Sequence, residues 1–91
     1  MALLPVAVSG VSSAGGGLIQ PSLQSFVRVG GNLISVRDTP IASHGSGGHS
    51  NAKTTGQSSV FHINGVPIDR EGDAASCGDL IENGVSWFRT D

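Results

Sequence analysis

Residues 60–69 read VFHINGVPID. Two short apolar runs flank Asn64-Gly65, a dipeptide that tolerates the positive φ needed at both central positions of a type I′ turn. Alternation of side chains along a strand puts His62 on the face opposite Phe61. The stretch therefore predicts a β-hairpin that turns at residues 64–65.

A second hairpin is predicted upstream, where residues 26–36 read FVRVGGNLISV. Gly30-Gly31 is the turn there, and a shift of 34 residues superposes it on Asn64-Gly65. A third, truncated copy begins at Ser86, and no sustained helical period occurs between residues 18 and 91. We therefore predict an all-β protein with about three internal repeats, although short hairpins also resemble one another without being repeats.

The N-terminal segment, residues 1–25, leads into these repeats. Residues 2–8 are apolar but have no positively charged region before them and are too short to span a bilayer, so we expect a buried or interface strand and no signal peptide. Residues 9–17 are rich in glycine and serine, which predicts a flexible loop. We expect residues 1–91 to form a single domain.

The composition points to a fold that needs a staple. The chain has 91 residues, of which 37% are hydrophobic and 4% aromatic, so burial of apolar surface leaves little margin of stability. Its single cysteine excludes an intramolecular disulfide. A bound metal or an assembly partner is the remaining source of stabilisation.

Charge and motifs exclude several function classes. The net charge is −2 and the five Lys and Arg residues are scattered, which disfavours binding of nucleic acid. The sequence has no His-Glu-x-x-His, no Cys-x-x-Cys, no phosphate-binding Gly-x-x-x-x-Gly-Lys-Ser/Thr and no Gly-x-Ser-x-Gly. We therefore expect a protein that is not an enzyme.

The three histidines and the cysteine are candidate metal ligands, spaced as His44-x4-His49-x12-His62-x14-Cys77. Imidazole nitrogen and thiolate sulfur are the ligands that four-coordinate zinc prefers, and the glycines between His44 and His49 let their rings converge. Alternatively, the two loop histidines are simply solvated, His62 is a hydrogen-bonded strand residue and Cys77 is a small buried apolar residue. The residue types alone leave both interpretations open.

From Val27 to Asp79 the chain resembles the PAAR-repeat family, the tip proteins of type VI secretion spikes and contractile phage tails. The resemblance is carried by residues 58–68, by Arg70-Glu71-Gly72-Asp73, by Cys77-Gly78 and by the His44/His49 pair. Two departures lie in the first repeat: Gly30-Gly31-Asn32-Leu33 stands in place of the usual Asn-Gly-x-Pro turn, and Arg37-Asp38 lacks the intervening x-Gly.

The resemblance implies a small cone of β-hairpins with pseudo-threefold symmetry, stapled near its apex by one structural Zn²⁺ that His44, His49, His62 and Cys77 hold. The base of the cone would cap a trimeric β-helical spike protein, with one tip per trimer. The N-terminal segment and Trp87-Phe88 are the candidate base residues. Residues 1–91 would then be a single tip domain without a fused effector domain.

In function, the resemblance implies a non-enzymatic tip that pierces membranes. Such a tip is assembled on the spike in the bacterial cytoplasm, is injected by the contractile apparatus, contacts the target-cell membrane transiently and can travel with effector cargo. Two alternatives fit the same residues: the tip of a contractile phage tail spike, and a small zinc-stapled adaptor that binds another protein.

Overall fold

The computed structural model describes residues 3–44 and 51–91, which form nine β-strands. These residues contain no helix, and therefore no helix that is long and apolar enough to cross a bilayer. The predicted all-β class is confirmed. The strands are β1 (Leu4–Val6), β2 (Ser13–Ala14), β3 (Gly17–Leu18), β4 (Arg28–Val29), β5 (Asn32–Leu33), β6 (His62–Ile63), β7 (Val66–Pro67), β8 (Ile81–Glu82) and β9 (Val85–Thr90).

Both predicted hairpins are present. Strands β4 and β5 pair across Gly30-Gly31, and β6 and β7 pair across Asn64-Gly65, with positive φ at all four turn residues. The positive φ values are those that the turn type requires. The ladders are shorter than predicted, two residues per strand, because the residues that follow β5 and β7 pair with other segments.

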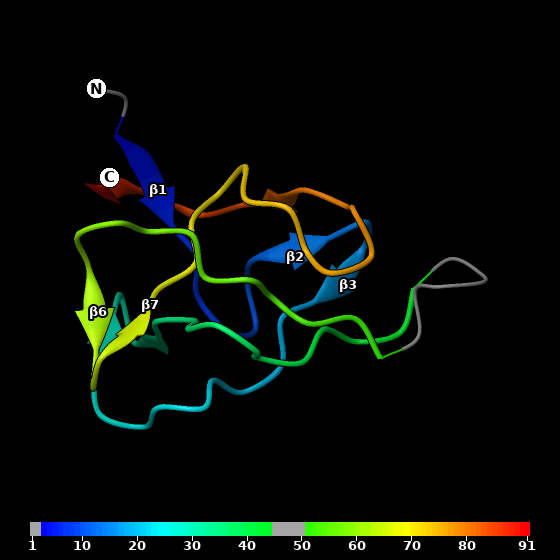
Figure 1. The fold of residues 1–91 in the computed structure, drawn as a ribbon, viewed down its shortest axis with the longest axis horizontal. Helices are drawn as coiled ribbons and strands as arrows, with labels where there is room; N and C mark the ends of the chain where they lie inside the picture. The colour runs from blue at the N-terminus through cyan, green and yellow to red at the C-terminus, as the bar shows by residue number, and fades with distance from the viewer. Residues whose placement is uncertain (1–2, 45–50) are drawn as a thin grey trace.

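The two ends of the described chain pair with each other. Strand β1 runs antiparallel to β9, with Leu4 opposite Thr90 and Pro5 opposite Arg89. Figure 1 shows this pair, with both termini, at the same end of the molecule as β6 and β7. Val6 at the end of β1 has no exposed surface, as we predicted for a buried N-terminal strand.

The prediction of a flexible loop for residues 9–17 is wrong. Strands β2 and β3 lie in this region and pair with each other, and β2 also pairs with β8. Gly15 and Gly16, with φ of 59° and 93°, make the turn between β2 and β3. Small residues such as Ala14 are fully buried here, so the glycine- and serine-rich composition reflects tight packing and a tight turn.

Three segments from distant parts of the chain form a closed ring of backbone hydrogen bonds. The amide of Ala7 donates to the carbonyl of Asp69 at 3.0 Å, Ser35 donates to Ala7 at 3.0 Å, and Asp69 donates to Ser35 at 2.9 Å. All three residues are fully buried. Each segment is thereby held by both of the others.

The ring has an apolar cluster on each side, because neighbouring side chains of an extended segment point to opposite faces. One cluster joins the neighbours of the ring residues to the inner faces of the hairpins: Val6, Val8, Val29, Ile34, Val36, Ile63 and Ile68. The other contains Ala7, Ala14, Ile19, Ile41, Ala52, Ala75 and Ile81, with Cys77 packed against it. Cys77 and the hairpins therefore lie on opposite sides of the ring.

Candidate metal centre

Two backbone segments bring His44 and Cys77 together. His44 follows residues 41–42, which are fixed to β3 and its neighbour by a bridge from Ile41 to Ile19 and by the Ala42 amide bonding to the Leu18 carbonyl at 2.9 Å. Cys77 lies in a tight turn in which the amide of Ala75 bonds to the carbonyl of Asp79 at 2.8 Å. Both segments are thus held by the fold itself.

Asp79, two residues after Cys77, completes a group of three metal-ligating side chains. His44 Nε2 lies 2.9 Å from Asp79 Oδ2, and Cys77 Sγ lies 3.6 Å from each of these two atoms. The three ligand atoms fall within 4.8 Å of one another, and the group could hold a metal ion.

The distances between these atoms suit a tetrahedral ion. With Zn–S bonds of about 2.3 Å and Zn–N or Zn–O bonds of about 2.1 Å, tetrahedral angles place sulfur about 3.6 Å from nitrogen or oxygen, and nitrogen about 3.4 Å from oxygen. Both sulfur distances already have this value. Only the His44–Asp79 pair, at 2.9 Å, is closer than an ion would leave it.

His44 is oriented as a ligand. Its Nδ1 lies 2.9 Å from the carbonyl oxygen of Ala42, to which it donates, so that Nε2 faces Cys77 and Asp79. Metal-bound histidines commonly donate their second ring N–H to a carbonyl in this way. The side chain of His44 is only 5% exposed, which keeps the ring in this orientation.

The same contacts raise the pKa of His44. The hydrogen bond to Ala42 is the largest cause, Asp79 adds to it through a hydrogen bond and its charge, and desolvation acts in the opposite direction. A metal ion at this centre would compete with protons for Nε2, so its binding is expected to weaken in acid.

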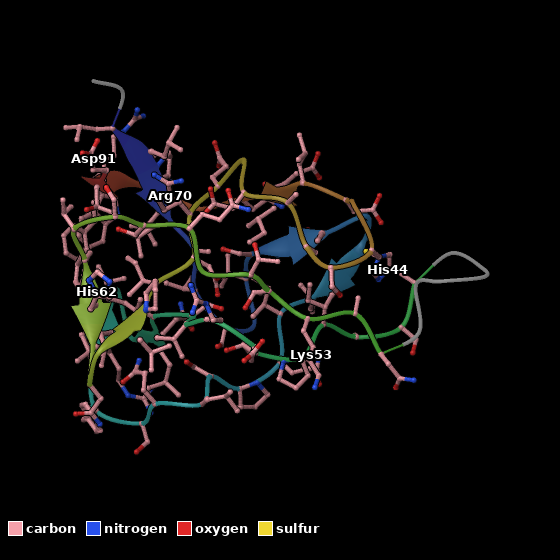
Figure 2. All side chains as sticks on the ribbon, in the orientation of Figure 1. His44, Lys53, His62, Arg70 and Asp91 are labelled. Atoms are coloured by element: carbon pink, nitrogen blue, oxygen red, sulfur yellow. The ribbon has the colours of Figure 1, made fainter. Side chains whose placement is uncertain are left out.

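Of the four ligands suggested by the sequence, the described structure brings two together, His44 and Cys77. His49 lies outside the described residues. The assignment of His62 needs correction: it lies exposed on β6, and Figure 2 shows it and His44 toward opposite ends of the longest axis. The reason is the alternation of β6, which turns His62 outward from a hairpin on the far side of the ring.

Asp79 was not predicted as a ligand, because the predicted set contained only histidine and cysteine and no carboxylates. One signal pointed to it: in Cys77-Gly78-Asp79, a glycine between two potential ligands permits a sharp turn. Gly78 has a φ of 94°, and Ala74 and Leu80 pair across the turn.

Comparisons with known proteins do not assign this chain to a family. No protein-family model matches this chain, and no curated protein sequence matches it.

Gly15 in the β2–β3 turn lies directly against the candidate metal centre. A methyl group there would overlap Asp79 Oδ2 and come within 2.8 Å of His44 Cδ2. If His44 and Asp79 hold a metal ion, Gly15→Ala should displace both side chains and weaken the binding of added zinc by about 10- to 100-fold, the usual effect of disturbing the surroundings of a metal ligand. Competition with a chromogenic chelator measures this.

Gly16→Ala is the matched control. Gly16 also has positive φ, so both substitutions add comparable backbone strain of about 1–2 kcal/mol, but nothing lies within 4 Å of a methyl group at Gly16. Gly16→Ala should keep the zinc affinity of the wild type. Equal zinc affinities for the two variants would contradict the arrangement of His44 and Asp79 described above.

Proposed function

We propose that this chain is the metal-stapled tip of a membrane-piercing spike, capping a trimeric β-helical spike protein as PAAR-repeat proteins do in type VI secretion systems. The observation that carries the proposal is the closed ring of hydrogen bonds through Ala7, Ser35 and Asp69. One chain thereby offers three backbone segments in equivalent roles, which is what a single cap on a threefold partner needs.

A pseudo-threefold cone accounts for the arrangement around the ring. Three two-stranded pairs lie at one end, namely β4–β5, β6–β7 and β1–β9. In this proposal the β1–β9 pair is the third hairpin, built from the two ends of the chain. The pairs form the base that meets the spike, and the side of the ring that carries Cys77 leads to the apex.

The metal is proposed to be Zn²⁺ with a structural role. His44, Cys77 and Asp79 would supply three ligands, and His49 is the predicted fourth. Four protein ligands leave no coordination position for water, so we propose cohesion and not catalysis. Near a point, few side chains are available for a core, and a metal that joins two chain segments replaces the missing packing.

In this role the tip is assembled on its spike in the cytoplasm of a bacterium and is injected with it, touching the target membrane only in passage. Rigidity at the point serves that purpose.

Stoichiometry tests the proposal. The chain is mixed with the purified trimeric β-helical spike protein encoded in the same genome, and the complex is weighed by native mass spectrometry. We expect one chain per trimer. Three chains per trimer would indicate an adaptor that binds each subunit separately. If no complex forms, the proposal that this chain caps a spike is wrong.

A further inference from the structure

The three hairpins expose the same chemistry at equivalent positions. Each has an exposed apolar residue and, two residues later, an exposed cationic or imidazole side chain. The apolar residues are 62%, 63% and 72% exposed for Phe26, Val60 and Trp87, respectively. We use the name hairpin face for these outward side chains: Phe26, Arg28, Val60, His62, Trp87 and Arg89.

The register of the strands makes the three donors equivalent. Arg28 pairs with Leu33 and His62 with Pro67, and in both hairpins the next pair along the chain is the last before the turn. Arg89 pairs with Pro5, and the next pair, Leu4 with Thr90, is likewise the last of its ladder. The residues between the outward ones are Val27, Phe61 and Phe88, and all three pack against the apolar cluster beneath. Side-chain alternation therefore fixes the hairpin face outward on all three hairpins.

The hairpin face carries two arginines and no acidic side chain, although the chain as a whole is negative. The chain has seven acidic residues and five Lys and Arg, yet the six strands of the three hairpins contain no Asp or Glu. Within the described residues, Arg28 donates one hydrogen bond, to the Gly31 carbonyl, and Arg89 donates one, to the Ser86 carbonyl. A guanidinium has five N–H donors, so most of them face outward.

We propose that the hairpin face recognises a homotrimer that presents, once per subunit, an apolar contact followed by a carboxylate. This inference rests on the proposed function and specifies the chemistry of the spike end. A homotrimer repeats one patch three times, and the hairpin face repeats one pattern three times. Carboxylates on the partner complement the guanidinium and imidazole donors. Trp87 and Phe26 are aromatic, and aromatic side chains contribute much of the buried area and binding energy at interfaces.

This assignment gives His62 a role other than metal binding. It occupies the position at which the other two hairpins have arginine, and its imidazole N–H can donate to a carboxylate of the third subunit. The hairpin face is thus approximately, not strictly, threefold. A strictly threefold spike end would meet two guanidinium groups and one imidazole.

Charge reversal tests the inference. We compare Arg89→Glu with Lys53→Glu, which makes the same change of charge at an exposed residue outside the hairpins. Binding of the spike trimer from the same genome is measured by calorimetry. Arg89→Glu should weaken binding by about tenfold or more, because it places like charges against each other. Lys53→Glu should bind like the wild type, and its melting temperature and that of Arg89→Glu should match the wild type.

Two further measurements, the salt dependence of binding and binding to lipid vesicles, complete the test. Raising the salt from about 50 to about 500 mM should weaken wild-type binding more than that of Arg89→Glu, because salt screens exposed charges. If the wild type binds one per trimer but Arg89→Glu and Lys53→Glu bind equally well, the inference fails and the proposed function stands. If the wild type binds no trimer, both fail. If Arg89→Glu loses binding only to phosphatidylglycerol vesicles, the hairpin face is a membrane surface and the inference is overturned.

Discussion

Cys77→Ser is expected to lose bound zinc and to lower the melting temperature. A serine hydroxyl is not ionised near neutral pH and is a poor zinc ligand, so His44 and Asp79 would be left without the sulfur that joins them. Structural zinc is associated with apparent binding energies of about 10–16 kcal/mol in zinc-finger peptides. Loss of only about 3 kcal/mol would lower the melting temperature of a domain of this size by roughly 12–24 °C.

His62→Ala is the control for this experiment. Its side chain lies on the hairpin face, away from His44, so the variant should keep its full zinc content and its melting temperature. Zinc content is measured by atomic emission and melting by circular dichroism. A zinc-loaded Cys77→Ser of unchanged stability would contradict the centre, and a zinc-free His62→Ala would show that the metal-bound chain has another arrangement.

Asp69→Asn is expected to change how stability depends on pH. Asp69 is fully buried in the ring, where its carboxylate accepts a hydrogen bond from Ser35 Oγ at 2.6 Å and one from the Gly56 amide at 2.7 Å. Burial raises the pKa of Asp69 above its ordinary value of 3.8 more than these hydrogen bonds lower it, and the charge of Asp73 adds to the rise.

The sign of the effect follows from the direction of this shift. Because the folded pKa is above the unfolded one, Asp69 stabilises the fold most below about pH 3.8, and this contribution is lost as the pH rises through the folded pKa. An asparagine has no charge to desolvate and can still accept the Gly56 hydrogen bond. Asp69→Asn should therefore gain stability relative to the wild type as the pH rises from acid toward neutral.

Urea unfolding at a series of pH values measures this difference. Asp38→Asn removes the same charge at an exposed position and keeps a residue suited to its positive φ of 69°, so it is the matched control. Release of the metal in acid affects wild type and variant alike and cancels in the comparison. A gap between Asp69→Asn and wild type that stays constant with pH would contradict the argument.

Local signals predicted the hairpins well. Asn64-Gly65 and Gly30-Gly31 each specify their own turn, and residues on either side need only their neighbours to pair. The same logic applied to Gly15-Gly16 would have found the β2–β3 turn, but the serines around it suggested a loop. Composition was a poorer guide there than the turn dipeptide.

Pairings between distant residues could not be predicted. The match of Leu4 with Thr90, and the ring that joins Ala7, Ser35 and Asp69, depend on contacts across most of the chain. No local property of these residues predicts such a contact. Asp69, an acidic residue at a fully buried position, even argues against burial when it is considered alone.

The candidate metal centre was predicted only in part, because it also depends on contacts between distant segments of the chain. Residue type alone singled out His44 and Cys77, which the structure brings together, and equally His62, which it places elsewhere. What separates them is the side of the ring on which each segment lies, a property of the whole fold. Asp79 lies beside Cys77 and His44 because of the tight turn at Gly78, a local feature that the sequence does contain.

Metal analysis of the purified chain shows directly whether one ion joins His44, Cys77 and Asp79. Atomic emission gives the amount of metal, and X-ray absorption at the zinc edge gives its neighbours. We predict one zinc per chain, with a single sulfur at about 2.3 Å and the remaining ligands nitrogen or oxygen at about 2.0–2.2 Å. A chain that folds without metal, or a zinc with no sulfur neighbour, would contradict the account.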